Sequence, residues 1–361
     1  MPRKFKKYYP IHISWACPEV VDLKLMAKKS VLLTGASGTV GFEVLKQLVD
    51  SNQYQLTVFD KKTESAIKKF ATFSEEVSIV YGDITIPKDV EKAAKNKEVV
   101  IHLAAIIPPL ADDKPALTKQ VNTEGTRLLI EKLEQHSPNA FFIYSSSISV
   151  YGDRLQDPYI RVGDPLNPSR GDEYAKTKIA AEKALEESKL DYTIFRLAAI
   201  MGGHKMSKLM FHQPLDTSLE IATPQDTARA FLKAIPKQKE LSKKIFNLGG
   251  GETCRTSYKD FLARSFAIYG LGEFDIPKKA FAEKNFHCGF YVDGDDLEQI
   301  LHHRRDSLID YFENEKANFS TFKKFGASLF RRPIKWYLLK QSEPYEALQT
   351  GDKQLKEVFF N

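Results

Sequence analysis

Long apolar runs are missing from this sequence. No hydrophobic stretch is long enough to span a bilayer, so we expect no transmembrane segment. Cysteine is scarce: the three residues Cys17, Cys254 and Cys288 share no metal-type spacing and form no obvious disulfide set. We therefore expect no metal site and a cytoplasmic, reducing environment. We find no internal repeat either.

The composition allows a sizeable folded core. Of the 361 residues, 42% are hydrophobic and 28% are charged, which suits one large domain or two. The net charge of +6 comes from 53 basic and 47 acidic residues, a mild excess that is more typical of solubility than of nucleic-acid binding. Residues 1–25 begin with charges and contain no clean apolar segment, so no signal peptide is expected. We interpret residues 1–27 as an extension of little structural weight, which an upstream start codon could add.

Residues 34–41, TGASGTVG, lie between a short apolar run at 31–33 and an amphipathic run at 42–49. This order predicts a strand, a glycine turn and a helix. Gly35 permits a tight turn, Gly38 lets the backbone approach a pyrophosphate, and Gly41 lets the helix pack against the strand. The free N–H groups at the start of the helix favour phosphate. The spacing is G-x-x-G-x-x-G, and in this context it predicts a dinucleotide site.

A second strand at 55–59 ends on Asp60, which lies 19 positions after Gly41. A carboxylate there can accept hydrogen bonds from the adenosine ribose, and its charge repels a 2′-phosphate. Asp60 therefore favours NAD, while Lys61 and Lys62 leave NADP open. The alternative is an ordinary solvated strand end.

Strands are expected to alternate with helices as far as residue 200, which predicts an α/β fold with a doubly wound parallel sheet. The further predicted strands lie at 77–81, 99–105, 140–144, 192–197 and 244–249, with helices at 121–134 and 172–190. Later segments, a strand at 219–222 and helices at 223–235, 256–268 and 294–315, suggest a smaller lobe. We divide the chain into a nucleotide-binding Rossmann domain (28–202, with the strand at 244–250), a substrate lobe (203–316) and a basic, aromatic tail (317–361).

Tyr174 and Lys178 are four residues apart, and no other of the 15 tyrosines has a lysine at that spacing. On a helix they share one face. A free tyrosine has a pKa of about 10, which a nearby ammonium lowers towards the range useful for proton transfer. Ser147, at a predicted strand end, can hydrogen-bond a substrate oxygen beside Tyr174. The alternative is a surface tyrosine beside a solvated lysine.

These segments together resemble the extended branch of the short-chain dehydrogenase/reductase superfamily. The similarity covers residues 28–251 through TGASGTVG (34–41), GDI (82–84), HLAA (102–105), YSSSISVYG (144–152), YAKTK (174–178) and FNLGGG (246–251). It implies that Tyr174 is the general acid/base, that Lys178 is its electrostatic partner and ribose ligand, and that Ser147 orients the substrate. It also implies that Asn122 holds a helix bend and a relay water. The expected cofactor-binding residues are Gly35, Ser37, Gly38, Thr39, Val40, Gly41, Asp60, Lys61, Asp83, Ile84, Leu103, Ala104, Ala105, Tyr174 and Lys178.

Two departures from the family pattern narrow the expected chemistry. Family dehydratases carry Thr-Asp-Glu where this chain has Ser147-Ile148-Ser149, and epimerases usually carry asparagine where it has Ala199. The segment 203–219 is short and offers little polarity for a diphosphate; its notable residues are His204, Lys205, Met206, Lys208, Leu209, Met210 and Phe211. We therefore predict an oxidoreductase acting on a less polar secondary alcohol or ketone, as in hydroxysteroid dehydrogenases and dihydroflavonol reductases. A nucleotide-sugar epimerase and a non-catalytic NAD(P)-binding protein remain as alternatives, and residues 206–211 could equally be lobe core.

The tail at 319–339 interleaves aromatic and basic residues, with Phe322, Phe325 and Leu329 at helical spacing. The favoured interpretation is a stripe that caps the substrate lobe or forms a homodimer contact. A sharper one is peripheral contact with an anionic membrane, although Pro333 limits insertion to short pieces. Nucleic-acid binding is not expected, because no recognition motif accompanies the charge.

Overall fold

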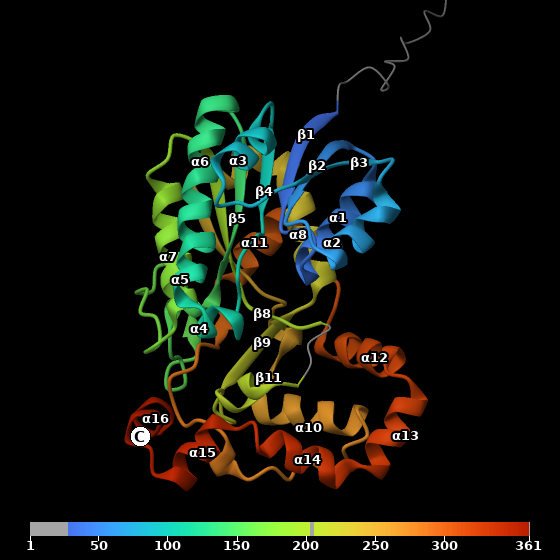
Figure 1. The fold of residues 1–361 in the computed structure, drawn as a ribbon, viewed down its shortest axis with the longest axis vertical. Helices are drawn as coiled ribbons and strands as arrows, with labels where there is room; N and C mark the ends of the chain where they lie inside the picture. The colour runs from blue at the N-terminus through green and yellow to red at the C-terminus, as the bar shows by residue number, and fades with distance from the viewer. Residues whose placement is uncertain (1–27, 203–205, 361) are drawn as a thin grey trace, which may run out of the picture.

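The computed structural model describes residues 28–202 and 206–360. The predicted extension at 1–27 and the residues Cys17, His204 and Lys205 lie outside the described residues. A seven-stranded parallel sheet occupies one half of the molecule, and a smaller lobe of strands and helices occupies the other (Figure 1). The strand order is β10-β7-β5-β4-β1-β2-β3. The predicted doubly wound Rossmann sheet is therefore confirmed.

The strands lie close to their predicted positions, although several boundaries move. They are β1 (Lys29–Thr34), β2 (Tyr54–Asp60), β3 (Val77–Tyr81), β4 (Val99–His102), β5 (Phe141–Ser147), β7 (Asp191–Leu197) and β10 (Lys244–Leu248). β4 is shorter than expected and ends at His102. β5 runs three residues further than expected, because the hydroxyl groups of Ser145 and Ser146 find buried partners in His102 O and Glu182.

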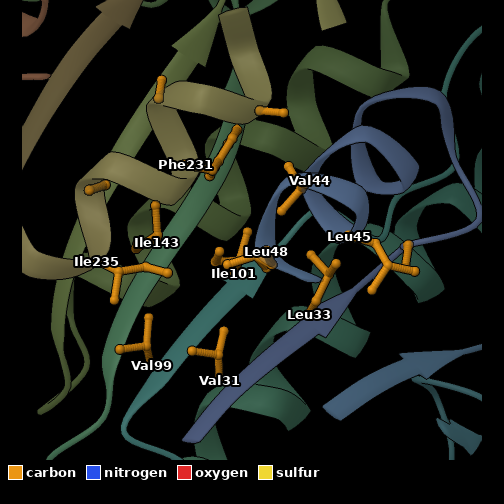
Figure 2. Close-up of a cluster of buried hydrophobic side chains, with 14 of the residues drawn as sticks. Val31, Leu33, Val44, Leu45, Leu48, Val99, Ile101, Ile143, Phe231 and Ile235 are labelled. Carbon is orange, nitrogen blue, oxygen red and sulfur yellow. The ribbon is translucent and has the colours of Figure 1, made fainter. Parts of the chain in front are cut away.

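Both faces of the sheet are covered by helices, as the continuous apolar strands require. Side chains alternate between the faces: Val31 and Leu33 join one core cluster and Leu32 the other. Figure 2 shows the first cluster, in which Val44 and Phe231 approach the sheet from two helices. Helices α1 (Thr39–Ser51), α2 (Glu64–Phe70), α8 (Pro224–Ala234) and α11 (Gly294–Leu301) cover this face, whereas α3 (Pro87–Ala94), α6 (Gly125–His136) and α7 (Glu173–Glu186) cover the opposite one.

The lobe is built around a three-stranded sheet in the order β11-β9-β8. Its elements are β8 (Ala199–Ile200), β9 (Ser218–Ala222), β11 (Arg255–Ser257), α10 (Tyr258–Ile268), α12 (Leu308–Asn318), α13 (Thr321–Leu329), α14 (Arg331–Leu339), α15 (Glu343–Thr350) and α16 (Lys353–Phe359). A third core cluster joins them, to which α14 contributes the buried Leu338. The tail is thus helical and packs on the lobe (Figure 1).

Several short elements lie between these, besides single 3-10 turns. They are α4 (Leu110–Asp113), α5 (Pro115–Thr118), a π-helical turn (Lys119–Glu124), α9 (Gln238–Leu241) and the paired strands β6 (Tyr159–Ile160) and β12 (Phe290–Tyr291).

Helix boundaries were the least accurate predictions. The expected helix at 294–315 is wrong as a single element: α11 stops at His302, which has a φ of 47°, and α12 starts after a Ser307 capping box. The expected helix at 256–268 begins instead as β11. Thr223 caps α8, since its side chain accepts a hydrogen bond from Asp226 N.

Candidate functional site

The glycine turn connects β1 to α1 at the carboxyl edge of the sheet. Gly35 has a φ of +73°, and a Cβ there would lie 2.6 Å from Ala104 N. A Cβ on Gly41 would lie 2.1 Å from Gly35 O. Gly35 and Gly41 are therefore required for close packing. A Cβ on Gly38 would lie 3.4 Å from Gly35 O, which is an ordinary contact distance. Gly38 is the N-cap of α1 and supplies no side-chain hydrogen bond to it, so the first amides of α1 are available to an anion.

Asp60 ends β2 beside this turn. Its carboxylate accepts hydrogen bonds from Ser37 N at 2.7 Å, from Ser37 Oγ at 3.1 Å and from Lys61 N at 2.7 Å. The Lys61 ammonium lies 3.2 Å from Asp83 Oδ2. Burial acts to raise the pKa of Asp83, but hydrogen bonds from Thr85 and the contact with Lys61 lower it overall. Asp60, Lys61 and Asp83 thus form a charged cluster next to the turn.

A cleft of about 370 Å³ opens between the glycine turn and the ends of β4, β5 and β7. Its walls bring together most of the residues predicted from the sequence. The predicted residues that line it are Gly35, Gly38, Thr39, Val40, Gly41, Leu103, Ala105, Ser147, Tyr174 and Lys178.

The other predicted residues do not line this cleft. Ile84 is 8% exposed and belongs to the core cluster beneath α3 and α6, and Ala104 packs its backbone against Gly35. Both atoms of the Asn122 amide pair with the backbone of Ile106, and its Nδ2 also donates to Thr177 Oγ1 at 3.1 Å. Asn122 lies in the π-helical turn before α6. It therefore ties this turn to the loop after β4 and to α7.

Tyr174, Lys178 and Ser147 meet on one wall of the cleft. Lys178 Nζ donates to Ser145 O at 2.7 Å and lies 5.7 Å from the centre of the Tyr174 ring. Ser147 lines the same wall, and its hydroxyl accepts a hydrogen bond from Ser149 N at 3.2 Å. A tyrosine, a lysine and a serine from α7 and β5 are thus arranged around one small volume.

The prediction that the Lys178 ammonium lowers the Tyr174 pKa is wrong for this structure. Burial raises this pKa well above its ordinary value, the hydrogen bond from Ser147 opposes the rise, and Asp172 adds to it. Burial also lowers the pKa of Lys178 to about 7, against the opposing effect of Glu182. Desolvation, which the sequence does not reveal, therefore outweighs the helical spacing on which the expectation was based.

Glu182 and Arg196 form a buried polar network behind this wall that our sequence analysis missed. Glu182 is 2% exposed and Arg196 is 3% exposed. The two side chains form an ion pair. The Glu182 carboxylate also accepts a hydrogen bond from the Ser146 hydroxyl, and Arg196 Nη1 donates to Tyr151 OH at 2.8 Å. Helical spacing could have revealed Glu182, since it follows Lys178 by four residues on the same helix.

His102 is fully buried at the end of β4. Its ring nitrogens lie 2.7 Å from Thr34 Oγ1 and 2.9 Å from Thr126 Oγ1, and burial lowers its pKa to about 3. It therefore stays neutral and connects β4 to its neighbours.

A larger cavity of about 550 Å³ adjoins the cleft, and Pro108, Ile200 and His287 line both spaces. Further apolar walls come from Met201, Leu209, Phe286, Val358 and Phe359. The segment 206–211 divides between the two expected roles: Leu209 lines the cavity, whereas Met210 and Phe211 are buried in the lobe core.

The C-terminal helices supply part of this cavity wall through Glu343, Val358 and Phe359. The stripe of Phe322, Phe325 and Leu329 that was expected to cap the lobe is exposed instead. Glu343, at the start of α15, accepts from Lys208 Nζ at 3.0 Å and lies 2.8 Å from His212 Nε2. Phe359 packs against the His212 ring with centroids 5.1 Å apart. The hydrogen bond from His212, joined by Lys208, lowers the pKa of Glu343 to about 2 although burial opposes it. These contacts join segments more than 130 residues apart.

Comparison with known proteins agrees with this geometry. Residues 32–191 match the 3-beta hydroxysteroid dehydrogenase/isomerase family. The chain is 32% identical over 186 residues to UDP-glucose 4-epimerase of Vibrio cholerae, a match that covers 48% of this chain and 52% of that protein. It is 30% identical over 183 residues to the decarboxylating sterol-4-alpha-carboxylate 3-dehydrogenase of Saccharomyces cerevisiae, covering 48% and 51%. The chain therefore spans about half the length of these curated relatives.

A solved structure extends the likeness beyond the matched half. A short-chain dehydrogenase/reductase superfamily protein from Agrobacterium tumefaciens, with bound NAD, superposes with a TM-score of 0.61 at 17% identity over 84% of this chain and 99% of that one. Residues 32–191 are thus similar to the hydroxysteroid dehydrogenase family, and the solved structure shows that most of the chain shares the short-chain dehydrogenase/reductase fold. Among the residues that the structure describes, no helix is both long and apolar enough to cross a bilayer.

Proposed function

We propose that the protein is an NAD(H)-dependent oxidoreductase that transfers a hydride between nicotinamide and a secondary alcohol or ketone. One observation carries the proposal: Tyr174, Ser147 and Lys178 meet on the wall of the glycine-turn cleft, where it adjoins a largely apolar cavity. Hydride transfer to a ketone needs a proton-transfer group between the cofactor and the substrate, and this arrangement supports that role for Tyr174.

The cleft fits a dinucleotide. Gly35 and Gly41 bring the turn against β4 and α1, and Gly38 leaves the start of α1 without a side-chain cap. The amides of that first turn would hold the pyrophosphate. When bound, NAD supplies the hydride acceptor or donor.

The chain's own residues would position the substrate and move its proton. Tyr174 Oη gives a proton to the ketone oxygen or takes one from the alcohol, and Ser147 Oγ hydrogen-bonds the same oxygen. The Lys178 ammonium, held by Ser145 O at 2.7 Å, stabilises the tyrosinate and holds the nicotinamide ribose. Asn122 keeps α7 in register with the loop after β4 through Thr177.

Asp60 supports the choice of NAD. Its two oxygens point to the glycine turn and pair with Ser37, so a 2′-phosphate would meet a carboxylate there. The Agrobacterium structure contains NAD. Lys61 is engaged by Asp83 at 3.2 Å, which reduces its availability to a phosphate.

The cavity favours an apolar substrate. Its walls include Met201, Leu209, Phe286 and Phe359, and Lys208 is paired with both Asp113 and Glu343. A cation paired in this way is a poor ligand for a diphosphate. The yeast relative is a sterol dehydrogenase, and a hydroxysteroid-like alcohol is the substrate class we propose.

An epimerase of nucleotide sugars is the second candidate, because the Vibrio relative is 32% identical over the matched half. A cytoplasmic location and a homodimer stay predictions.

Turnover assays separate these functions. The purified protein would be incubated with NAD and a panel of hydroxysteroids, small secondary alcohols and UDP-glucose. Accumulation of reduced nicotinamide with an alcohol supports the oxidoreductase. Formation of the 4-epimer of UDP-glucose without net reduction supports the epimerase. Cofactor binding without turnover of any panel member would overturn both.

A further inference from the structure

Helices α13 and α14 carry large apolar side chains that face solvent. Phe322 is 85% exposed, Phe325 69%, Leu329 68% and Trp336 58%. None of the residues of α13 is buried. Exposing such side chains to water is unfavourable. A cluster of them on consecutive helices usually marks a contact surface.

The opposite sides of the two helices are fixed to the lobe. Leu338 is buried in the lobe core, Ala327 and Ile334 pack against it, and Lys335 Nζ pairs with Asp275 at 2.6 Å. Lys324 O lies close to Gly270, where a Cβ would meet it at 2.5 Å. The two helices thus form a packed scaffold that leaves these side chains exposed. In Figure 1, α13 and α14 lie at the end of the lobe far from the large sheet.

Positive charge surrounds this apolar face. No acidic residue occurs between positions 321 and 341. Within the described chain, five exposed cations of this segment take part in no ion pair: Lys323, Lys324, Arg331, Arg332 and Lys340. Lys340 Nζ instead lies 3.9 Å above the Trp336 ring.

We propose that the outer face of α13 and α14 docks on an anionic lipid bilayer. The apolar side chains would enter the boundary between headgroups and acyl chains, Trp336 and Tyr337 would lie at headgroup level, and the cations would meet lipid phosphates. Pro333 lies in the first turn of α14, where it does not break the helix. The two short helices thus give a surface that lies on the membrane and does not cross it.

A second copy of the chain fits this face less well. A two-fold contact places the same patch against itself, so the five cations of one copy would face five of the other without an acidic partner. The bilayer supplies the opposite charge. The proposal does not depend on the reaction that the cleft supports, so either can fail without the other.

Vesicle co-sedimentation of the full chain tests the proposal. The probes are vesicles of phosphatidylcholine alone and of phosphatidylcholine with about a third phosphatidylserine. We expect binding to the anionic vesicles that weakens as salt rises. A triple variant, Phe322→Ser with Phe325→Ser and Trp336→Ser, should bind at least about tenfold more weakly.

A variant without the five cations separates the electrostatic contribution to binding from the apolar one. Replacing all five cations by glutamine should remove the salt dependence and most of the binding, while Lys335 stays to keep its pair with Asp275. The control is Ile86→Ser with Lys88→Gln and Lys239→Gln, which removes exposed apolar and basic groups elsewhere and should bind as the wild type does. Unfolding midpoints confirm that each variant is folded.

Three outcomes would overturn the proposal. The first is no sedimentation with anionic vesicles at low salt. The second is equal binding by the wild type and the triple variant. The third combines two results: the wild type binds no vesicles, and it sediments as a dimer whereas the triple variant sediments as a monomer. That outcome would assign the face to a second copy.

Discussion

Glu182 and Arg196 form a two-pronged ion pair in the interior, with Arg196 Nη2 2.7 Å from Oε2 and Nε 3.1 Å from Oε1 of the carboxylate. The same carboxylate lies one helical turn after Lys178 and raises its pKa against the effect of burial. The pair therefore connects the interior of the sheet to the charge on the proposed ribose-binding lysine.

Glu182→Gln should destabilise the protein severely. The change leaves the buried Arg196 guanidinium without its counter-charge, which typically costs about 3–5 kcal/mol. Urea unfolding measures the loss. Glu186→Gln, one turn later and exposed, is the matched control and should stay within about 0.5 kcal/mol of the wild type. Equal stability of the two variants would show that the pair contributes little.

The sequence predicted the sheet well because each parallel strand is a short apolar run bounded by turn residues. It also placed Tyr174, Lys178 and Ser147 together, since helical spacing and strand ends are local properties. It could not show the cavity wall, because Glu343 and His212 meet only through the packing of the lobe. Burial was equally hidden, and it reverses the expected shift of the Tyr174 pKa.

Asp60 is expected to set the cofactor preference. Asp60→Ser should move the kcat/KM ratio towards NADP(H), because the charge that repels a 2′-phosphate is removed. The substitution also removes a partner of Ser37 N, so affinity for NAD(H) should fall. Asp60→Asn is the comparison variant, because it also removes the charge but keeps a hydrogen-bond acceptor of similar size. It therefore separates the effect of the charge from the loss of the bond to Ser37 N. A wild type that already prefers NADP(H) would refute the role of Asp60 and favour Lys61 and Lys62.

Glu343 should make docking of the C-terminal helices depend on pH. Its pKa is lowered to about 2 in the folded protein from an ordinary 4.5, so the unfolded chain binds more protons between these values. The stabilisation is complete above about pH 4.5 and is lost as the pH falls through 2.

Urea unfolding across this pH range measures the effect. The wild type should exceed Glu343→Gln by about 1 kcal/mol at neutral pH, after allowance for solvent screening, and the difference should shrink in acid. Glu346→Gln, exposed on the same helix, should show no such pH dependence. A constant difference between wild type and Glu343→Gln at all pH values would contradict the ion-pair interpretation.

The central claim is that Tyr174 transfers the proton during hydride transfer, and Tyr174→Phe tests it most directly. The variant keeps the ring that packs in the cleft wall and removes only the hydroxyl. The measurement is kcat for the best alcohol of the substrate panel, together with the dissociation constant for NAD, and Tyr159→Phe at an exposed position is the control. We predict that kcat falls by about 10²–10⁴-fold while NAD binding is largely retained; a variant with wild-type turnover would contradict the account.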